Sequence, residues 1–259
     1  AVRPGSAPLG DQMVHLDMGQ PDALTASMQT ARFDVVVSCM ASRTGMPKDA
    51  WAVDHDAHMV VLASAKSSGV AQFVQLSALC VQRPQLPFQR AKLAFETALI
   101  DSGITYSIVR PTAFFKSLCG QVERVCAGKP FVLFGDGQLT ACKPISERDL
   151  GRYLADCVGN PERANSILPI GGPGPAITPL DQGEALVDLL GRGPHYRRVP
   201  AAMMDAIVAG LSLAGKVSSA ARDKADLARI GRYYATQSML VWDVPTGAYC
   251  AQATPEAGT

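Results

Sequence analysis

Side chains able to hold sugars and phosphates follow the ends of several apolar segments in this chain. Serine and threonine hydroxyls and arginine guanidinium groups donate hydrogen bonds to such oxygens. If the apolar segments are parallel strands, their ligand lies beyond their carboxyl ends, where the strand order reverses. This rule selects Arg3, Asp17, Ala41, Ser42, Arg43, Ser77, Pro111 and Thr112. We expect these residues to form one binding site.

The elements that must position these residues alternate between two patterns. Near-continuous apolar runs at 33–40, 72–81 and 104–110 are typical of strands buried on both faces. Between them, three- and four-residue spacing predicts helices over 50–68 and 87–102, each followed by a glycine. Short connections between strand and helix predict parallel strands joined by right-handed crossovers.

The fold class predicted is therefore α/β, a doubly wound parallel sheet of the Rossmann type. Residues 13–18 and 1–2 are interpreted as earlier strands, and 167–170 as a short strand returning to the sheet. We expect residues 1–150 to form an incomplete NAD(P)-binding domain. Residues 151–259, which include an apparently helical stretch over 180–232, would form a smaller substrate-binding region.

Arg3 bears on the choice of dinucleotide. The residue just beyond the second strand of such a fold faces the adenosine ribose, where an acid suits a free 2′-hydroxyl and an arginine suits a 2′-phosphate. Arg3 therefore favours NADPH over NADH, and a solvated arginine at the same position is the alternative.

The segment Phe88-Gln-Arg-Ala-Lys92 carries the most specific local signal. Short-chain dehydrogenases place Tyr-x-x-x-Lys on the helix after the strand that ends in serine, and this spacing puts both side chains on one helix face. Here Lys92 is the candidate catalytic and ribose-binding residue, with Ser77 at the strand end. Phe88 occupies the tyrosine position and cannot transfer a proton. This departure disfavours carbonyl reduction and leaves reduction of a carbon–carbon double bond, or no chemistry.

Composition lowers the expectation of several other partners. The formal net charge of the 259 residues is +1, so nothing at the level of the whole chain attracts nucleic acid. The seven cysteines form no Cys-x-x-Cys pair and the four histidines form no ligand cluster, so we expect free thiols and no metal.

The stretch Met203–Val217 is the most apolar part of the chain. It is shorter than the roughly 20 residues that span a bilayer and contains Asp205, so we expect no transmembrane segment. A buried helix is the favoured interpretation, and peripheral contact with a membrane is the alternative.

Longer segments resemble a known family, the NmrA-like, atypical branch of the short-chain dehydrogenase superfamily, and more narrowly its 8-vinyl reductases of chlorophyll and bacteriochlorophyll synthesis. The similar segments include DVVVSCMASRTG (34–45), QLSALCVQRPQLPFQRAKLAFE (75–96), YSIVRPTAFFKSL (106–118), GKPFVLFGDGQLTACKPISERDL (128–150), LPIGGPGPAITPLDQGE (168–184) and IGRYYATQSMLV (230–241).

The resemblance implies an NADPH-dependent oxidoreductase acting on divinyl chlorophyllide or a related tetrapyrrole. It also implies a location in a plastid or in the cytoplasm of a phototrophic bacterium. The pocket for so flat and apolar a substrate would be lined by aromatic groups. The substrate-binding candidates are Phe88, Phe114, Phe115, Tyr233 and Tyr234.

The chain departs from the family pattern at its ends. The Gly-rich turn that brings a helix N-terminus to the pyrophosphate is absent from the first residues, and the family pattern continues past Thr259. We therefore expect a chain truncated at both ends that binds cofactor poorly.

Two alternatives share the fold. A non-catalytic, dinucleotide-sensing NmrA-like protein is compatible with the loss of the tyrosine. A sugar-nucleotide epimerase normally needs that tyrosine, so the site, and not the fold, separates these hypotheses.

Overall fold

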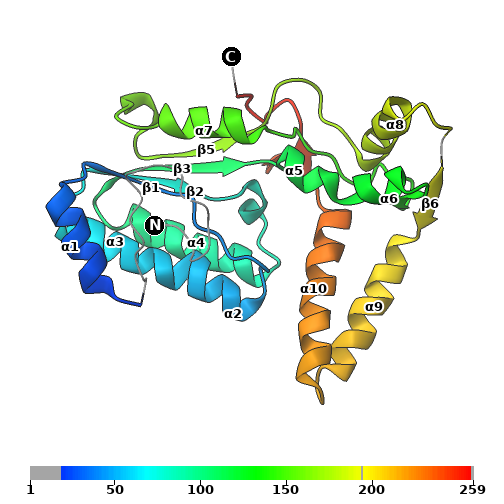
Figure 1. Ribbon diagram of the computed structural model, residues 1–259, viewed down its shortest axis with the longest axis horizontal. Coiled ribbons are helices and arrows are strands. Elements are labelled where there is room, and N and C mark those ends of the chain that lie inside the picture. The colour runs from blue at the N-terminus through cyan, green and yellow to red at the C-terminus, as the bar shows by residue number, and fades with distance from the viewer. Residues whose placement is uncertain (1–18, 194, 258–259) are drawn as a thin grey trace.

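The computed structural model describes residues 19–193 and 195–257. Its central sheet has four parallel strands in the order β1-β2-β3-β5 (Figure 1). These are β1 (Val35–Ser38), β2 (Gln72–Leu76), β3 (Thr105–Pro111) and β5 (Ser166–Ile170). Because all four run the same way, their carboxyl ends meet along one edge of the sheet.

Helices cover both faces of this sheet (Figure 1). Three lie on one side, namely α1 (Pro21–Ala31), α3 (His58–Ser67) and α4 (Pro87–Ile100), and α7 (Glu147–Ala155) covers the other. Phe73, Phe95 and Ile108 pack in the core on the first side, whereas Val109 and Leu150 belong to the second. Burial of apolar surface on both faces explains why the strand sequences are almost continuously apolar.

The helical segment after β1 changes its winding. It begins with α2 (Pro47–Ala50), passes through a π-helix at Trp51–Ala57 and continues as α3 without a break. A π-helix widens the turn and rotates the side chains that follow it, and such turns are frequent at functional sites. The segment ends at Ser67, and Gly69 follows with a φ of +73°, which glycine adopts without strain.

A second group of elements lies beside the sheet (Figure 1). In it β4 (Phe131–Phe134) pairs in parallel with β6 (Tyr196–Val199), and β7 (Val241–Asp243) pairs antiparallel with β8 (Ala248–Cys250). The remaining helices are α5 (Phe115–Leu118), α6 (Val122–Cys126), α8 (Pro179–Leu189), α9 (Ala201–Ala214) and α10 (Ser219–Thr236). Short 3₁₀ turns occur at Leu79–Gln82, Cys119–Gln121 and Pro161–Arg163.

The predicted parallel sheet with helices on both faces is confirmed, and two element predictions need correction. The strand expected over 72–81 ends at Leu76, the last residue that pairs with β3. The apolar run continues beyond it because Leu79, Cys80 and Val81 are buried in a 3₁₀ turn. The helical stretch expected over 180–232 is three helices interrupted by β6. The strands predicted at 1–2 and 13–18 lie outside the described residues.

A substitution at Gly172 tests how closely the chain after β5 packs against the backbone at Lys143 and Pro144. The Gly172 N–H donates to the Lys143 carbonyl oxygen (3.0 Å), and a Cβ built on this glycine collides with the backbone carbonyl of Pro144. We expect Gly172→Ala to lower the free energy of unfolding by about 2 kcal/mol or more, because backbone must move to relieve the collision. Gly151→Ala, in the exposed middle of α7 with open space around it, is the matched control and should stabilise by up to about 1 kcal/mol. Urea denaturation measures both, and equal midpoints would contradict this account.

Candidate functional site

A cavity of about 800 Å³ opens where β1, β2 and β3 end. The sheet side of its wall consists of the segments that follow these strands, 39–45, 76–78 and 111–114. The opposite side comes from β4 and from the last two turns of α10, including Ile230 and Tyr234. The cavity therefore lies where a doubly wound sheet binds its ligand.

Most of the residues selected from the sequence meet at this cavity. Those among its lining residues are Ala41, Ser42, Arg43, Ser77, Phe88, Lys92, Pro111, Thr112, Phe114 and Tyr234. Arg3 and Asp17 lie outside the described residues.

The structure does not bring two of the predicted substrate-binding residues, Phe115 and Tyr233, to the cavity wall. Phe115 begins α5 and is 52% exposed on the outside of the molecule. Tyr233 is 2% exposed and packs in the core with Phe88, its hydroxyl donating to the Cys80 carbonyl oxygen (3.3 Å). Consecutive residues on a helix point about 100° apart, so only one of Tyr233 and Tyr234 can face the cavity.

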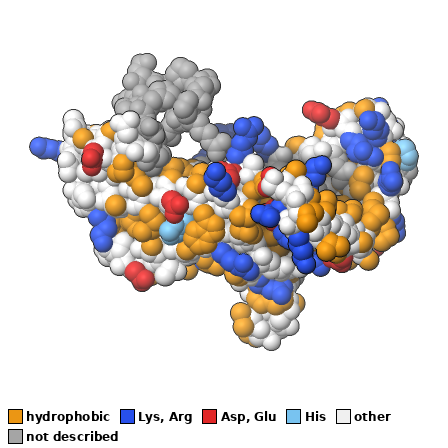
Figure 2. Space-filling view, turned by 90° about the horizontal axis from the view of Figure 1, so that it is seen from below, with side chains coloured by type: hydrophobic (Ala, Val, Ile, Leu, Met, Phe, Trp, Pro, Cys, Tyr) orange, Lys and Arg blue, Asp and Glu red, His pale blue; other side chains and the backbone are white. Residues whose placement is uncertain are grey.

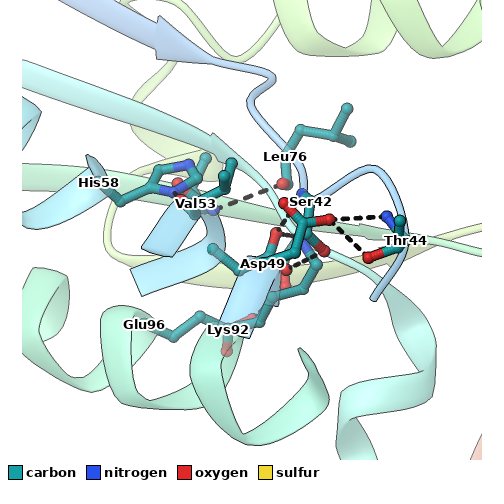
Figure 3. Close-up of polar contacts among 11 residues, drawn as sticks. Ser42, Thr44, Asp49, Val53, His58, Leu76, Lys92 and Glu96 are labelled. Carbon is teal, nitrogen blue, oxygen red and sulfur yellow. Dashed lines mark hydrogen bonds and ion pairs between the residues drawn. The ribbon is translucent and has the colours of Figure 1, made fainter. Parts of the chain in front are cut away.

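A buried ion pair holds Lys92 in place. Its Nζ lies 2.9 Å from Oδ1 of Asp54, and the two side chains are 8% and 0% exposed. The same carboxylate accepts hydrogen bonds from the Ser42 backbone N–H (3.0 Å) and the Ser42 hydroxyl (2.6 Å). In Figure 3, Ser42 and Lys92 converge from the loop after β1 and from α4. One acid thus ties together the π-helix, α4 and the loop that forms part of the cavity wall.

A second buried acid, Glu96, lies one turn further along α4. It accepts hydrogen bonds from the Ser77 hydroxyl and from the Arg110 guanidinium, whose Nε is 3.3 Å from Oε1. The Ser77 side chain is therefore bound to Glu96, while the residue itself still borders the cavity. This pairing joins the ends of β2 and β3 to α4.

The cavity wall favours an anionic and largely apolar ligand. Among the described residues that line it, Arg43 and Lys92 are basic and none is acidic. Burial raises the pKa of the Cys80 and Cys142 thiols to about 11 in each case, so both stay neutral at physiological pH. The Lys92 ammonium, which has three N–H donors, donates one of them to Asp54. These features fit a dinucleotide, which carries phosphates and ribose hydroxyls.

His58 lies next to this network, fully buried at the start of α3. Its Nδ1 is 2.8 Å from the Val53 carbonyl oxygen, its ring packs against Phe95, and Nε2 has no hydrogen-bond partner among the described residues. Burial lowers the pKa of His58 to about 4, because a charged ring cannot be solvated there. The histidine is therefore neutral at physiological pH.

Sequence reasoning did not select Asp54 or Glu96, the two acids that organise the site. A signal was present in each case, because each acid falls on the apolar side of its helix, Asp54 with Ala50 and Val61, and Glu96 with Lys92 and Leu99. A charge on a buried face indicates a charge with a partner. No comparable pattern in the sequence predicts the π-helix that carries Asp54.

A parallel sheet whose strand ends border a basic, acid-free cavity defines an α/β protein of the dinucleotide-binding class. The chain belongs to the NAD(P)H-binding family, whose model matches residues 4–161.

Relatives of known function extend the similarity beyond that region. The chain is 52% identical over 256 residues to a chloroplastic divinyl chlorophyllide a 8-vinyl-reductase of Cucumis sativus, covering 96% of this chain and 61% of the relative. It is 50% identical over 257 residues to the Arabidopsis thaliana protein of the same name, covering 96% of this chain and 62% of the relative. The chain thus spans about three fifths of the length of the curated relatives it matches.

Solved structures share the fold at low sequence identity. The NADPH-dependent quinone oxidoreductase QOR2 of Escherichia coli, complexed with NADPH, superposes with a TM-score of 0.63 at 19% identity, covering 94% of this chain and 79% of that one. A UDP-glucuronic acid 4-epimerase of Bacillus cereus gives 0.64 at 18% identity, with 74% and 70% covered. These likenesses support the Rossmann-type architecture alone.

Removing the carboxylate of Asp54 should destabilise the protein. Asp54→Ala leaves Lys92 buried without a counter-charge, and breaking one side of such a pair costs about 3–5 kcal/mol. Asp56→Ala is the matched control, because Asp56 is 69% exposed and pairs with His55 at the surface, where the loss is about 0–1 kcal/mol. Urea denaturation compares the two variants. Similar losses would show that the Asp54–Lys92 pair contributes no more than a surface pair.

Acid should weaken the fold through His58. Its pKa is about 4 in the folded protein and about 6.5 in an unfolded chain. Below pH 6.5 the unfolded chain therefore takes up a proton that the folded protein refuses. Stability should fall by about 3 kcal/mol between pH 6.5 and 4. His58→Gln should reduce this slope, whereas His55→Gln, at a partly exposed position, should retain it. Denaturant midpoints measured across this pH range test the prediction, and a slope unchanged in His58→Gln would contradict it.

Proposed function

We propose that this protein is an NADPH-dependent reductase that converts the 8-vinyl group of divinyl chlorophyllide, or a related tetrapyrrole, to an ethyl group. The observation that carries the proposal is sequence identity of 50–52% with 8-vinyl reductases over 96% of the chain, through the sheet and the segments around the cavity. A cavity without a tyrosine at position 88 supports the same reaction class.

The cofactor side of the site is assigned to the strand ends and to α4. We propose that Lys92 donates to the nicotinamide ribose and that Ala41, Ser42, Arg43, Ser77, Pro111 and Thr112 border the dinucleotide. Arg3 would select the 2′-phosphate, and Asp17 would lie near the same nucleotide. In this assignment residues 1–150 hold the cofactor, and residues 151–259 complete the substrate side.

The substrate side is supported by the apolar part of the wall. Phe88, Phe114 and Tyr234 line the cavity, and a flat macrocycle packs well against aromatic rings. A tetrapyrrole propionate is an anion, and the nearest cations on the wall are Arg43 and Lys92. Neither Lys116 nor Arg232 borders the cavity.

The chemistry needs orientation more than acid catalysis. When bound, NADPH would supply a hydride to one carbon of the vinyl group, and the conjugated macrocycle would take up the resulting negative charge. The protein then has no alkoxide to protonate, which explains why Phe88 is compatible with reduction. Lys92, held by Asp54, fixes the ribose end of the cofactor. Water delivers the final proton in this proposal.

The substrate and the relatives indicate the cellular compartment that we propose. The relatives from Cucumis sativus and Arabidopsis thaliana are chloroplastic. We propose a plastid, or the cytoplasm of a phototrophic bacterium, as the compartment, with peripheral contact to a membrane. Among the described residues, none of the helices combines the length and apolar character needed to cross one.

An absorbance assay of divinyl chlorophyllide with NADPH, and with NADH for comparison, tests the function in the full-length protein. The full-length Cucumis sativus reductase is the positive control. We expect NADPH-dependent loss of the divinyl spectrum, at least about tenfold slower for Lys92→Ala because a ribose contact is removed. Phe88→Tyr should keep the parental rate, since this position lies outside the proton path. NADPH binding without turnover, while the control turns over, would favour the dinucleotide sensor.

A further inference from the structure

The α9–α10 hairpin projects away from the rest of the molecule (Figure 1). Its two helices pack on each other, and no residue of α9 is buried. The sequence favoured a buried helix here, and the structure contradicts that expectation. A helix of largely apolar composition with no buried side chain needs a partner.

Several apolar side chains of α9 are exposed to water, whereas Met204, Val208 and Leu211 are half-buried and Met204 lies against Gly231 of α10. Met203 and Ile207 are 46% and 42% exposed, and Leu213 near the tip is 67% exposed. Val217, in the turn between the helices, is 91% exposed. Small exposed residues separate them, namely Ala202, Ala206, Ala209, Gly210 and Ala214. The helix is thus apolar on more than one side, and one of these apolar sides is in contact with water.

The charges of the hairpin are distributed unevenly. Asp205 is paired with Arg232, and Asp226 with Arg229, so the acids on the body of the hairpin are neutralised. Around the tip stand Lys216, Arg222 and Lys224 against the single acid Asp223, all of them exposed. The tip is therefore apolar with a basic margin. Figure 2, which views the molecule from below, shows hydrophobic side chains with Lys and Arg side chains beside them on this face.

We propose that the tip of the hairpin, Leu213 to Lys224, inserts into the interface of an anionic lipid bilayer. Apolar side chains that enter the headgroup boundary, flanked by lysine and arginine, match the way interfacial segments bind such surfaces. A second copy of the chain is a poorer occupant, because a stable protein interface needs roughly 800 Å² of complementary surface on each side. A narrow projecting tip suits a fluid partner.

The hairpin also connects this surface to the cavity. Ile230 and Tyr234, further along α10, line the cavity wall. If the proposed function holds, an apolar tetrapyrrole dissolved in the bilayer would meet the protein at the same helix. This link rests on the proposed function, whereas binding of the tip to lipid does not.

Vesicle flotation of the chain tests the proposal without an activity readout. We expect binding to vesicles with phosphatidylserine in phosphatidylcholine, and weaker binding to phosphatidylcholine alone or at high salt. The variant Leu213→Glu/Val217→Glu should bind at least about tenfold more weakly, because apolar burial is replaced by charge. Leu189→Glu is the matched control, since Leu189 is 85% exposed but lies on α8, and its binding should equal that of the parent.

Two further measurements distinguish binding to lipid from binding to a second copy of the chain. Lys216→Glu/Lys224→Glu should weaken binding to the anionic vesicles by about fivefold or more for each lysine. Val217→Trp, corrected for Trp51 and Trp242, should shift its emission to the blue when vesicles are added. Equal binding of the parent and Leu213→Glu/Val217→Glu would overturn the proposal. So would a concentration-dependent dimer that this double variant abolishes in the absence of vesicles.

Discussion

The buried ion pair between Lys92 and Asp54 is the interaction on which the site depends. Two charges are removed from water, which is costly unless each is paired and hydrogen-bonded. Asp54 meets this condition by accepting from Lys92 and twice from Ser42. Three elements that are distant in sequence must therefore come together for the carboxylate to be satisfied. The position of the lysine at the cavity wall follows from this requirement.

The wall around this lysine defines what the cavity can accept. Arg43 brings positive charge to the wall, the charge of Lys92 is balanced by Asp54, and the remainder of the wall is mostly apolar or neutral. A ligand that combines phosphates or carboxylates with a large apolar ring system satisfies both parts. Phe88, where a tyrosine acid would be expected, packs in the core with Tyr233 and Ala91. The site therefore orients its reactants and provides no acid at this position.

Much of this arrangement could be predicted from the sequence, because the parallel sheet leaves a strong pattern. The order of elements follows from the apolar runs at 33–40 and 104–110 and from the glycines after each helix. The order of the strands then selects most of the cavity residues. The rule of strand ends does not select the two acids, because Asp54 and Glu96 lie within helices; the signal that marks them is their place on an apolar helix face. Tyr233 and Tyr234 were equivalent by composition, and only the helix rotation distinguishes them. β6 was missed because its pairing with β4 is non-local.

The π-helix at Trp51–Ala57 gives the segment after β1 two separate helical phases. One extra residue in a turn offsets everything downstream by about 100° relative to a continuous α-helix. Upstream of the offset, Ala50 packs against α4 beside the cavity; downstream, Leu62 and Ala65 join the core beneath the sheet. The two halves of the segment thus pack in different clusters along α4, the first with Phe88 and Ala91 and the second with Phe95 and Leu99. As a consequence, the pattern of apolar residues before the π-helix can change independently of the pattern after it. The number of residues between Ala50 and His58 must stay the same.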